Sequence, residues 1–164
     1  MKSAYFAAGC FWCITPTFRE RAGVSGVTSG YCGGTEENPT YEDVKYQRTG
    51  HRETIRICYD PEQVSYSQLL QIFLEGVDPF DGGGQFIDRG HSYTLAVYYG
   101  TEEERSCAEA AIRALEAQSG QRVQISLEPL GSFYAAEEYH QNYDLKHPAE
   151  FEEELISSGR KERP

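Results

Sequence analysis

The chain has 164 residues, a formal net charge of −11, and 39% hydrophobic and 13% aromatic residues. This length fits one globular domain with a sizeable core, and the acidic balance argues against nucleic acid as a partner. The sequence has neither a run of 18 apolar residues nor a signal-peptide pattern, so we expect no membrane association and a cytoplasmic protein.

The first half of the chain alternates between strand and helix patterns. The predicted strands and helices are a strand at Ser3–Ala8, a helix from soon after Cys10 to about Arg21, a strand at Val24–Tyr31, a short helix at Tyr41–Tyr46, a strand at Arg52–Tyr59 and a helix at Ser65–Glu75. In the third of these strands, Glu53 shares one face with Ile55 and Ile57.

The second half begins with a glycine-rich stretch, residues 78–85, which predicts a long surface loop of the kind that often carries function. The patterns that follow are a strand at Ser92–Tyr99 with Tyr93 on its inner face, a helix at Glu102–Gln118, a strand at Val123–Leu127, an acidic aromatic segment at Phe133–Tyr143 and a helix near Ala149–Ile156. Hairpin-length and helical connections both occur, so we predict an α/β (α+β) fold with a mixed sheet flanked by helices. One catalytic domain is expected over residues 1–164, with a core of about 1–147 and an acidic helix of about 149–158.

The most informative stretch is Gly9-Cys10-Phe11-Trp12-Cys13. Proline is tolerated in a helix only within the first turn, so Pro16 predicts that a helix begins within a few residues of Cys10. A sulfur near a helix N-terminus is favoured as a thiolate. Cys10 and Cys13 could be a nucleophile and its resolving thiol, a thioredoxin-type dithiol, or two cysteines that only pack.

The other cysteines and the histidines predict no metal site. Five cysteines without a signal peptide indicate thiol chemistry in a reducing compartment rather than a disulfide scaffold. No second Cys-x-x-Cys motif or spaced histidine pair accompanies the first motif. Cys58 and Cys107 fall inside regular elements, where a packing role is expected.

Glu53 is the second anomaly of the sequence, because its strand face is otherwise apolar. Desolvation there would raise the pKa of the carboxyl group, and a protonated carboxylic acid can act as a general acid. The alternative is a glutamate at a strand end that reaches water, since Gly50 and His51 come just before it. Tyr31 and Tyr93 adjoin glycine turns, but a packed tyrosine ring is the default.

Taken in order, these pieces resemble the A-type peptide methionine sulfoxide reductases. The matching residues span nearly the whole chain: Gly9-Cys10-Phe11-Trp12, Gly30-Tyr31 with Gly33-Gly34, Asn38-Pro39-Thr40-Tyr41, Thr49-Gly50-His51, Glu53, Tyr59-Asp60-Pro61, Asp88 with Gly90 and Tyr93, and Phe133-Tyr134 through His140-Gln141. For the fold, we expect a ferredoxin-like plait core with long surface loops.

The resemblance implies reduction of methionine S-sulfoxide, free or in proteins, without a cofactor. The site residues it implies are the nucleophile Cys10, the acid Glu53 helped by the hydroxyls of Tyr31 and Tyr93, the methyl pocket of Phe11 and Trp12, and the less direct substrate contacts Asp88 and His140. A sulfenic acid on Cys10 would then form a disulfide, which a thioredoxin-like dithiol would reduce.

The chain departs from the family in its resolving thiol. Many members carry resolving cysteines in a glycine-rich C-terminal tail, whereas this chain has no cysteine after Cys107. Cys13 is the first choice for that role, Cys32 is the second, and an external thiol could act directly. Two other functions stay open at this point: a general dithiol–disulfide oxidoreductase that uses Cys10 and Cys13, and a non-catalytic module that binds methionine-bearing peptides.

Overall fold

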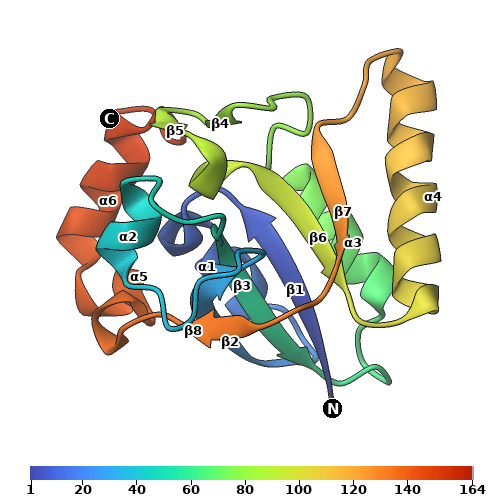
Figure 1. The fold of residues 1–164 in the computed structure, drawn as a ribbon, viewed down its shortest axis with the longest axis horizontal. Coiled ribbons are helices and arrows are strands. Elements are labelled where there is room, and N and C mark those ends of the chain that lie inside the picture. The colour runs from blue at the N-terminus through green and yellow to red at the C-terminus, as the bar shows by residue number, and fades with distance from the viewer. Residues whose placement is uncertain (164) are drawn as a thin grey trace.

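The computed structural model describes residues 1–163, and its largest feature is a curled six-stranded sheet (Figure 1). The sheet order is β7-β6-β1-β3-β2-β8, and every neighbouring pair is antiparallel except β6 and β7, which are parallel. The strands are β1 (Lys2–Ala8), β2 (Val24–Cys32), β3 (Arg52–Tyr59), β6 (Leu95–Tyr99), β7 (Ile125–Pro129) and β8 (Phe133–Ala135), with a separate ribbon of β4 (Gly84–Gln85) and β5 (Asp88–Arg89).

Six α-helices surround the sheet: α1 (Phe11–Arg19), α2 (Tyr41–Lys45), α3 (Tyr66–Glu75), α4 (Glu102–Ser119), α5 (Tyr143–Lys146) and α6 (Pro148–Ser157). The segment β1-α1-β2-β3-α3-β6, with its strands ordered β6-β1-β3-β2, forms the predicted ferredoxin-like plait. The expected α+β fold with a mixed sheet is therefore confirmed. None of the helices described is long and apolar enough to cross a membrane.

The two faces of the sheet are covered differently. Helices α1 and α3 pack on one face, over a large apolar cluster that includes Phe6, Phe18 and Ile55. The other face carries a smaller cluster around Cys32 and Tyr98, which the connection from β7 to β8 covers as it crosses the sheet (Figure 1). Adjacent residues of β3 therefore face two different environments.

The turn from β1 into α1 fixes the position of the Cys10 side chain. Gly9 has a φ of +84°, and a Cβ atom there would lie 2.8 Å from the Cβ atom of Gln85, so only glycine fits. Helix α1 begins at Phe11 with Cys10 as its N-cap, close to the predicted start. The reasoning from Pro16 was wrong, however, because this proline lies inside the helix and not in its first turn.

The glycine-rich loop is ordered by one buried side chain. Gln85 is 1% exposed; its amide NH₂ donates to the carbonyl of Asp78, and its amide oxygen accepts the Asp78 N–H. The predicted strand at Ser92–Tyr99 is shorter than expected, because His91–Tyr93 forms a 3₁₀ turn after Gly90, whose φ is +115°. Tyr93 therefore does not lie on the inner face of a strand; the turn directs it elsewhere.

Candidate active site

A cavity of about 290 Å³ opens where the start of α1, strand β3, the loop around Asp88 and helix α6 meet. Its lining combines a thiol, carboxyl groups, aromatic rings and one lysine: Cys10, Trp12, Tyr41, Lys45, Glu53, Ile87, Asp88, Tyr93 and Glu154. Five of the predicted site residues line the cavity directly: Cys10, Trp12, Glu53, Asp88 and Tyr93. The sequence pattern did not single out Lys45, Ile87 or Glu154.

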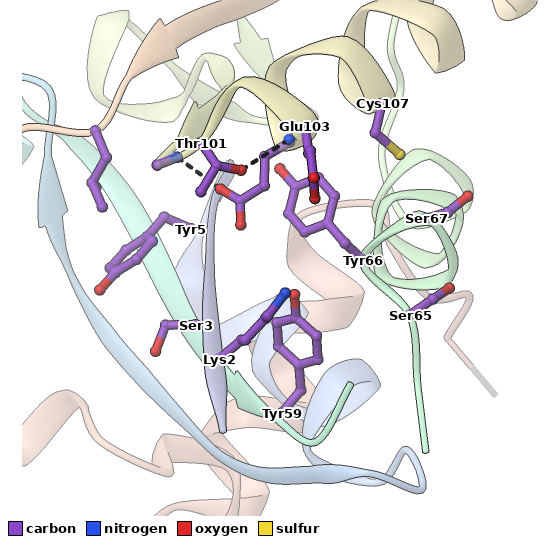
Figure 2. A pocket seen from close by; sticks show the side chains of 13 residues that line it. Lys2, Ser3, Tyr5, Tyr59, Ser65, Tyr66, Ser67, Thr101, Glu103 and Cys107 are labelled. Atoms are coloured by element: carbon purple, nitrogen blue, oxygen red, sulfur yellow. Dashed lines mark hydrogen bonds between the residues drawn. The ribbon is translucent and has the colours of Figure 1, made fainter. Parts of the chain in front are cut away.

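A larger cavity of about 540 Å³ lies at the opposite end of the sheet, between the start of β1 and the N-termini of α3 and α4 (Figure 2). Three tyrosines and three serines are among its lining residues, and its thiol is that of Cys107. Its Glu104 carboxylate already accepts the N–H of Gly100. Only the smaller cavity places a buried carboxyl group beside a buried thiol, and we therefore treat it as the candidate active site.

The Cys10 thiol is 6% exposed and sits at the first turn of α1. The expected thiolate is not found: the neighbouring Cys13 thiol, burial, and the nearby carboxyl groups of Glu53 and Asp88 together raise the pKa of Cys10. The helix N-terminus does not offset this, because its first N–H group, that of Phe11, donates to Glu53 and not to the sulfur. The Cys10 side chain is therefore a neutral thiol at rest.

Glu53 is 1% exposed, so the alternative of a glutamate that reaches water at a strand end is wrong. Burial raises the pKa of its carboxyl group to about 8; the hydrogen bond from the Phe11 N–H, 3.1 Å long, opposes this shift, and the Asp88 charge adds to it. Glu53 is consequently protonated at neutral pH. A protonated acid at the wall of a cavity can donate its proton to a bound oxygen.

Trp12 is held in place by a set of stacked rings. Its indole Nε1–H donates to Nδ1 of His140 over 3.2 Å, and the Tyr143 ring stacks on it with centroids 3.9 Å apart. Burial lowers the pKa of His140, which keeps the imidazole neutral and able to accept this bond. Phe11 packs behind against His140 and Tyr31 and does not line the cavity. His140 thus orients the cavity wall, and Tyr143 is a supporting residue that the sequence pattern did not single out.

The tyrosines divide into two groups. Tyr93 and Tyr41 line the cavity, and burial, as the largest cause, raises the pKa of both hydroxyls, so they are neutral donors. Tyr31 stands opposite Glu53 in the β2–β3 register, but its hydroxyl donates to Glu137 over 2.9 Å. Tyr41 lay within the matched Asn38-Pro39-Thr40-Tyr41 stretch, and that match could have identified it.

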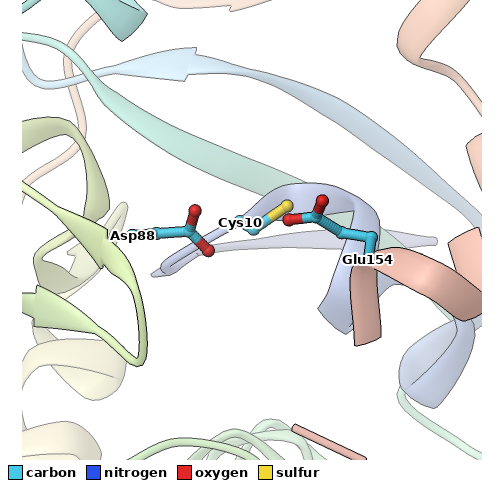
Figure 3. A group of neighbouring side chains, drawn as sticks. All are labelled: Cys10, Asp88 and Glu154. Atoms are coloured by element: carbon cyan, nitrogen blue, oxygen red, sulfur yellow. The ribbon is translucent and has the colours of Figure 1, made fainter. Parts of the chain in front are cut away.

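Asp88 and Glu154 flank the Cys10 sulfur from two sides (Figure 3). One ligand atom from each of these three residues lies within 4.8 Å of the others, and this is the one cluster in residues 1–163 with metal-ligating side chains so close together. The Asp88 carboxylate is already paired with Arg160, whose Nη1 lies 3.0 Å away. A cation is therefore already in contact with this part of the site.

The two candidate resolving thiols lie in different places. Cys13 is in the first turn of α1, half-buried, and its thiol is the largest contributor to the raised pKa of Cys10. Cys32 is fully buried in the cluster on the other face of the sheet, and burial raises the pKa of its thiol to about 11. The sheet itself separates Cys32 from Cys10.

A ferredoxin-like α+β domain with a buried acid and thiol at one cavity defines a cysteine-dependent enzyme. The family model described as peptide methionine sulfoxide reductase matches residues 2–163, and the chain belongs to this family. It is 45% identical over 159 residues to the peptide methionine sulfoxide reductase MsrA of Bacillus licheniformis, covering 96% of this chain and 88% of that protein. The MsrA of Bacillus subtilis is 43% identical over 164 residues, with 96% and 90% covered.

Solved structures give the same result. The methionine sulfoxide reductase A of Corynebacterium diphtheriae superposes with a TM-score of 0.81 at 32% identity, covering 90% of this chain and 75% of that one. The reduced form of Mxr1 from Saccharomyces cerevisiae superposes with a TM-score of 0.84 at 25% identity, covering 90% and 86%.

Proposed function

We propose that this protein reduces methionine S-sulfoxide, free or in proteins, to methionine. Residues 1–164 act as one catalytic domain, and the five free cysteines support a cytoplasmic location. The observation that carries the proposal is the protonated Glu53 at the wall of the cavity that holds Cys10. The membership of this chain in the peptide methionine sulfoxide reductase family supports the same substrate class.

In the first step, the Cys10 sulfur attacks the sulfoxide sulfur while the sulfoxide oxygen takes the proton of Glu53. A sulfoxide is a poor electrophile until its oxygen is protonated, so the acid must be neutral when the substrate binds. The Cys10 proton passes to the Glu53 carboxylate, and the oxygen ends on Cys10. Thiol and sulfoxide thus become sulfenic acid and thioether with no net change in protons.

The cavity residues assist this step in distinct ways. The Tyr93 hydroxyl donates a hydrogen bond to the sulfoxide oxygen. Trp12 encloses the methyl group, and Phe11 and His140 hold its indole ring in place. Tyr31 contributes through Glu137, whose second carboxylate oxygen accepts the N–H of Tyr41. Asp88 lies at the mouth of the cavity, where the substrate backbone would pass.

In the second step, Cys13 attacks the sulfenic acid, water leaves, and a Cys10–Cys13 disulfide forms. The position of both thiols at the first turn of α1 supports Cys13, and the position of Cys32 across the sheet argues against that residue. Residues three apart on a helix have Cβ atoms about 5–6 Å apart, whereas a disulfide needs about 3.5–4.5 Å, so the first turn of α1 must shift. A thioredoxin-like dithiol would then reduce the disulfide.

The test is turnover of purified methionine S- and R-sulfoxide with dithiothreitol as reductant. We expect methionine from the S epimer only, and none with Cys10→Ser. Comparable rates on the R epimer, or full activity in Cys10→Ser, would overturn the proposal. Non-reducing peptide mapping after one equivalent of S-sulfoxide should find a Cys10–Cys13 disulfide, whereas a Cys10–Cys32 disulfide would contradict the second step.

A further inference from the structure

Helix α6 carries three consecutive glutamates with different surroundings. Glu152 pairs with Lys161 and Glu153 pairs with Arg163, both on the outer side of the helix. Glu154 instead points to the Cys10 sulfur (Figure 3), and in the described part of the chain its half-buried carboxylate has neither an ion-pair nor a hydrogen-bond partner. Among the described residues, the active-site cavity therefore has at its wall an acidic group that contacts no cation directly.

The surroundings of Glu154 leave room for one added positive charge. Asp88, the neighbouring carboxylate, is compensated by Arg160, which also lies 4.6 Å from the centre of the Phe86 ring. Lys45 lines the cavity but is exposed, and its ammonium group lies over the Tyr41 and Tyr46 rings. Burial and the Asp88 charge raise the pKa of Glu154, and the charges of Arg160 and Lys45 oppose this shift without cancelling it. A cation brought by the substrate would remove this penalty.

We propose that Glu154 is a specificity-determining residue that selects methionine sulfoxide with a free α-ammonium group. The inference rests on the proposed function and names the substrate form that the site prefers. Such a group is found in the free amino acid and in an N-terminal residue, but not in a residue within a chain.

The length of the methionine side chain supports this assignment. Only two carbon atoms separate the sulfur from Cα, so the amino group lies at the cavity mouth when the sulfur contacts Cys10. Asp88 and Glu154 line the same cavity, and one carboxylate oxygen of each lies within 4.8 Å of the Cys10 sulfur. An ammonium group offers three N–H donors and a charge to these two carboxylates, whereas an amide offers one N–H donor. The cavity volume of about 290 Å³ suits one amino acid better than a larger ligand.

The test compares three substrates at pH 7, where α-amino groups are mostly protonated. These are free methionine S-sulfoxide, its amide, and N-acetyl-methionine S-sulfoxide. We expect the two substrates with an ammonium group to have the higher kcat/KM. In Glu154→Gln, the kcat/KM ratio of free to acetylated substrate should fall about tenfold, as for the loss of one charge-assisted hydrogen bond.

Glu150→Gln is the matched control, because it removes the same charge from an exposed position of α6 and should keep the ratio. An unchanged ratio in Glu154→Gln, or an equal loss on all substrates, would overturn the proposal; an equal loss would indicate a general role in the chemistry. Equal rates on the amino acid and its amide would support selection of any N-terminal residue. A faster rate on the amino acid would support selection of the free form, whose carboxylate would then face Lys45 in the cavity lining.

Binding measured without turnover separates this inference from the proposed function. Calorimetry on Cys10→Ser should give tighter binding of free than of acetylated methionine S-sulfoxide, and Cys10→Ser with Glu154→Gln should abolish the difference. If the wild-type protein reduced neither sulfoxide, the proposed function would fail, while these binding ratios would still decide the role of Glu154.

Discussion

Two neighbouring residues of β3, Arg52 and Glu53, are both buried ionisable groups, yet they face opposite sides of the sheet. Arg52 has three side-chain partners, one of them an opposite charge: it donates to Thr94, Tyr98 and Glu128, the last over 2.6 Å. Glu53 accepts one backbone N–H and otherwise faces a cavity. A buried ionisable group that is paired with an opposite charge keeps its own charge and holds its partner in place. A buried carboxyl group without such a partner is protonated instead, and can then act as an acid.

The two buried cysteines repeat this contrast, and their substitution should give the largest effect. Cys10→Ala removes the nucleophile, so turnover should fall by roughly 10⁴-fold or more. Cys32→Ala removes a thiol of similar burial from the other face and should change turnover less than about twofold, at a modest cost in stability. Steady-state assays with dithiothreitol, with thermal melts of both variants, measure this. A comparable loss in Cys32→Ala would contradict the division between the faces.

The pair Glu53→Gln and Arg52→Met tests the contrast itself. Glu53→Gln keeps the shape but removes the acid, so kcat should fall by about 10²–10⁴-fold while the fold is retained. Arg52→Met leaves Glu128 without its partner and should lower the free energy of unfolding by about 2 kcal/mol, a partial loss because the Glu128 side chain is 33% exposed. Urea unfolding and initial rates on one substrate separate the two effects. If Arg52→Met lost catalysis without losing stability, the contrast would be wrong.

Cys13→Ser should give a smaller effect, because it acts after the chemical step. The first turnover should still release about one equivalent of methionine, since Cys10 and Glu53 are intact. Turnover driven by thioredoxin should then fall by roughly 10- to 100-fold, because the sulfenic acid has no neighbouring thiol. Rapid-quench measurement of methionine distinguishes the burst from the steady state. The absence of a burst would place Cys13 in the first step.

The smallest effect is the change in stability over one pH unit, which follows from the pKa of Glu53, about 8 in the folded protein and near 4.5 when exposed. Between these values the folded state holds a proton that the unfolded state has lost, so stability falls as pH rises, by at most about 1.4 kcal/mol per unit. Above pH 8 this loss is complete, and kcat should fall as well. Glu53→Gln should remove this part of the slope in urea unfolding between pH 5 and 9. Parallel slopes in both proteins would contradict the raised pKa.

The sequence pattern predicted most strands and helices of the core, because alternation in β3 and the start signals of the helices are local, and the family resemblance supplied the plait arrangement. The capping boxes that Thr40 and Ser65 form at α2 and α3 are examples. It failed where geometry depends on distant contacts. Tyr93 is directed by a 3₁₀ turn after Gly90, and the pKa of Cys10 depends on where the Phe11 N–H points.

The candidate site shows the same limit. Cys10 and Glu53 stand out locally, one as a thiol after a glycine turn and the other as a carboxyl on an apolar strand face. Glu154 belongs to a run of acidic residues that looks like a solvated helix face, and only the packing of α6 near α1 brings it to Cys10. Arg160 reaches Asp88 across 72 positions of the sequence, which no local pattern indicates.

The central claim is that Glu53 is protonated at neutral pH while its neighbour Arg52 keeps its charge. Carbon-13 NMR of glutamate carboxyl groups, compared between the wild-type protein and Glu53→Gln, follows this proton directly. We predict that the signal missing in the variant titrates with a pKa of about 8. A signal that titrates near the ordinary value of about 4.3 would contradict the account.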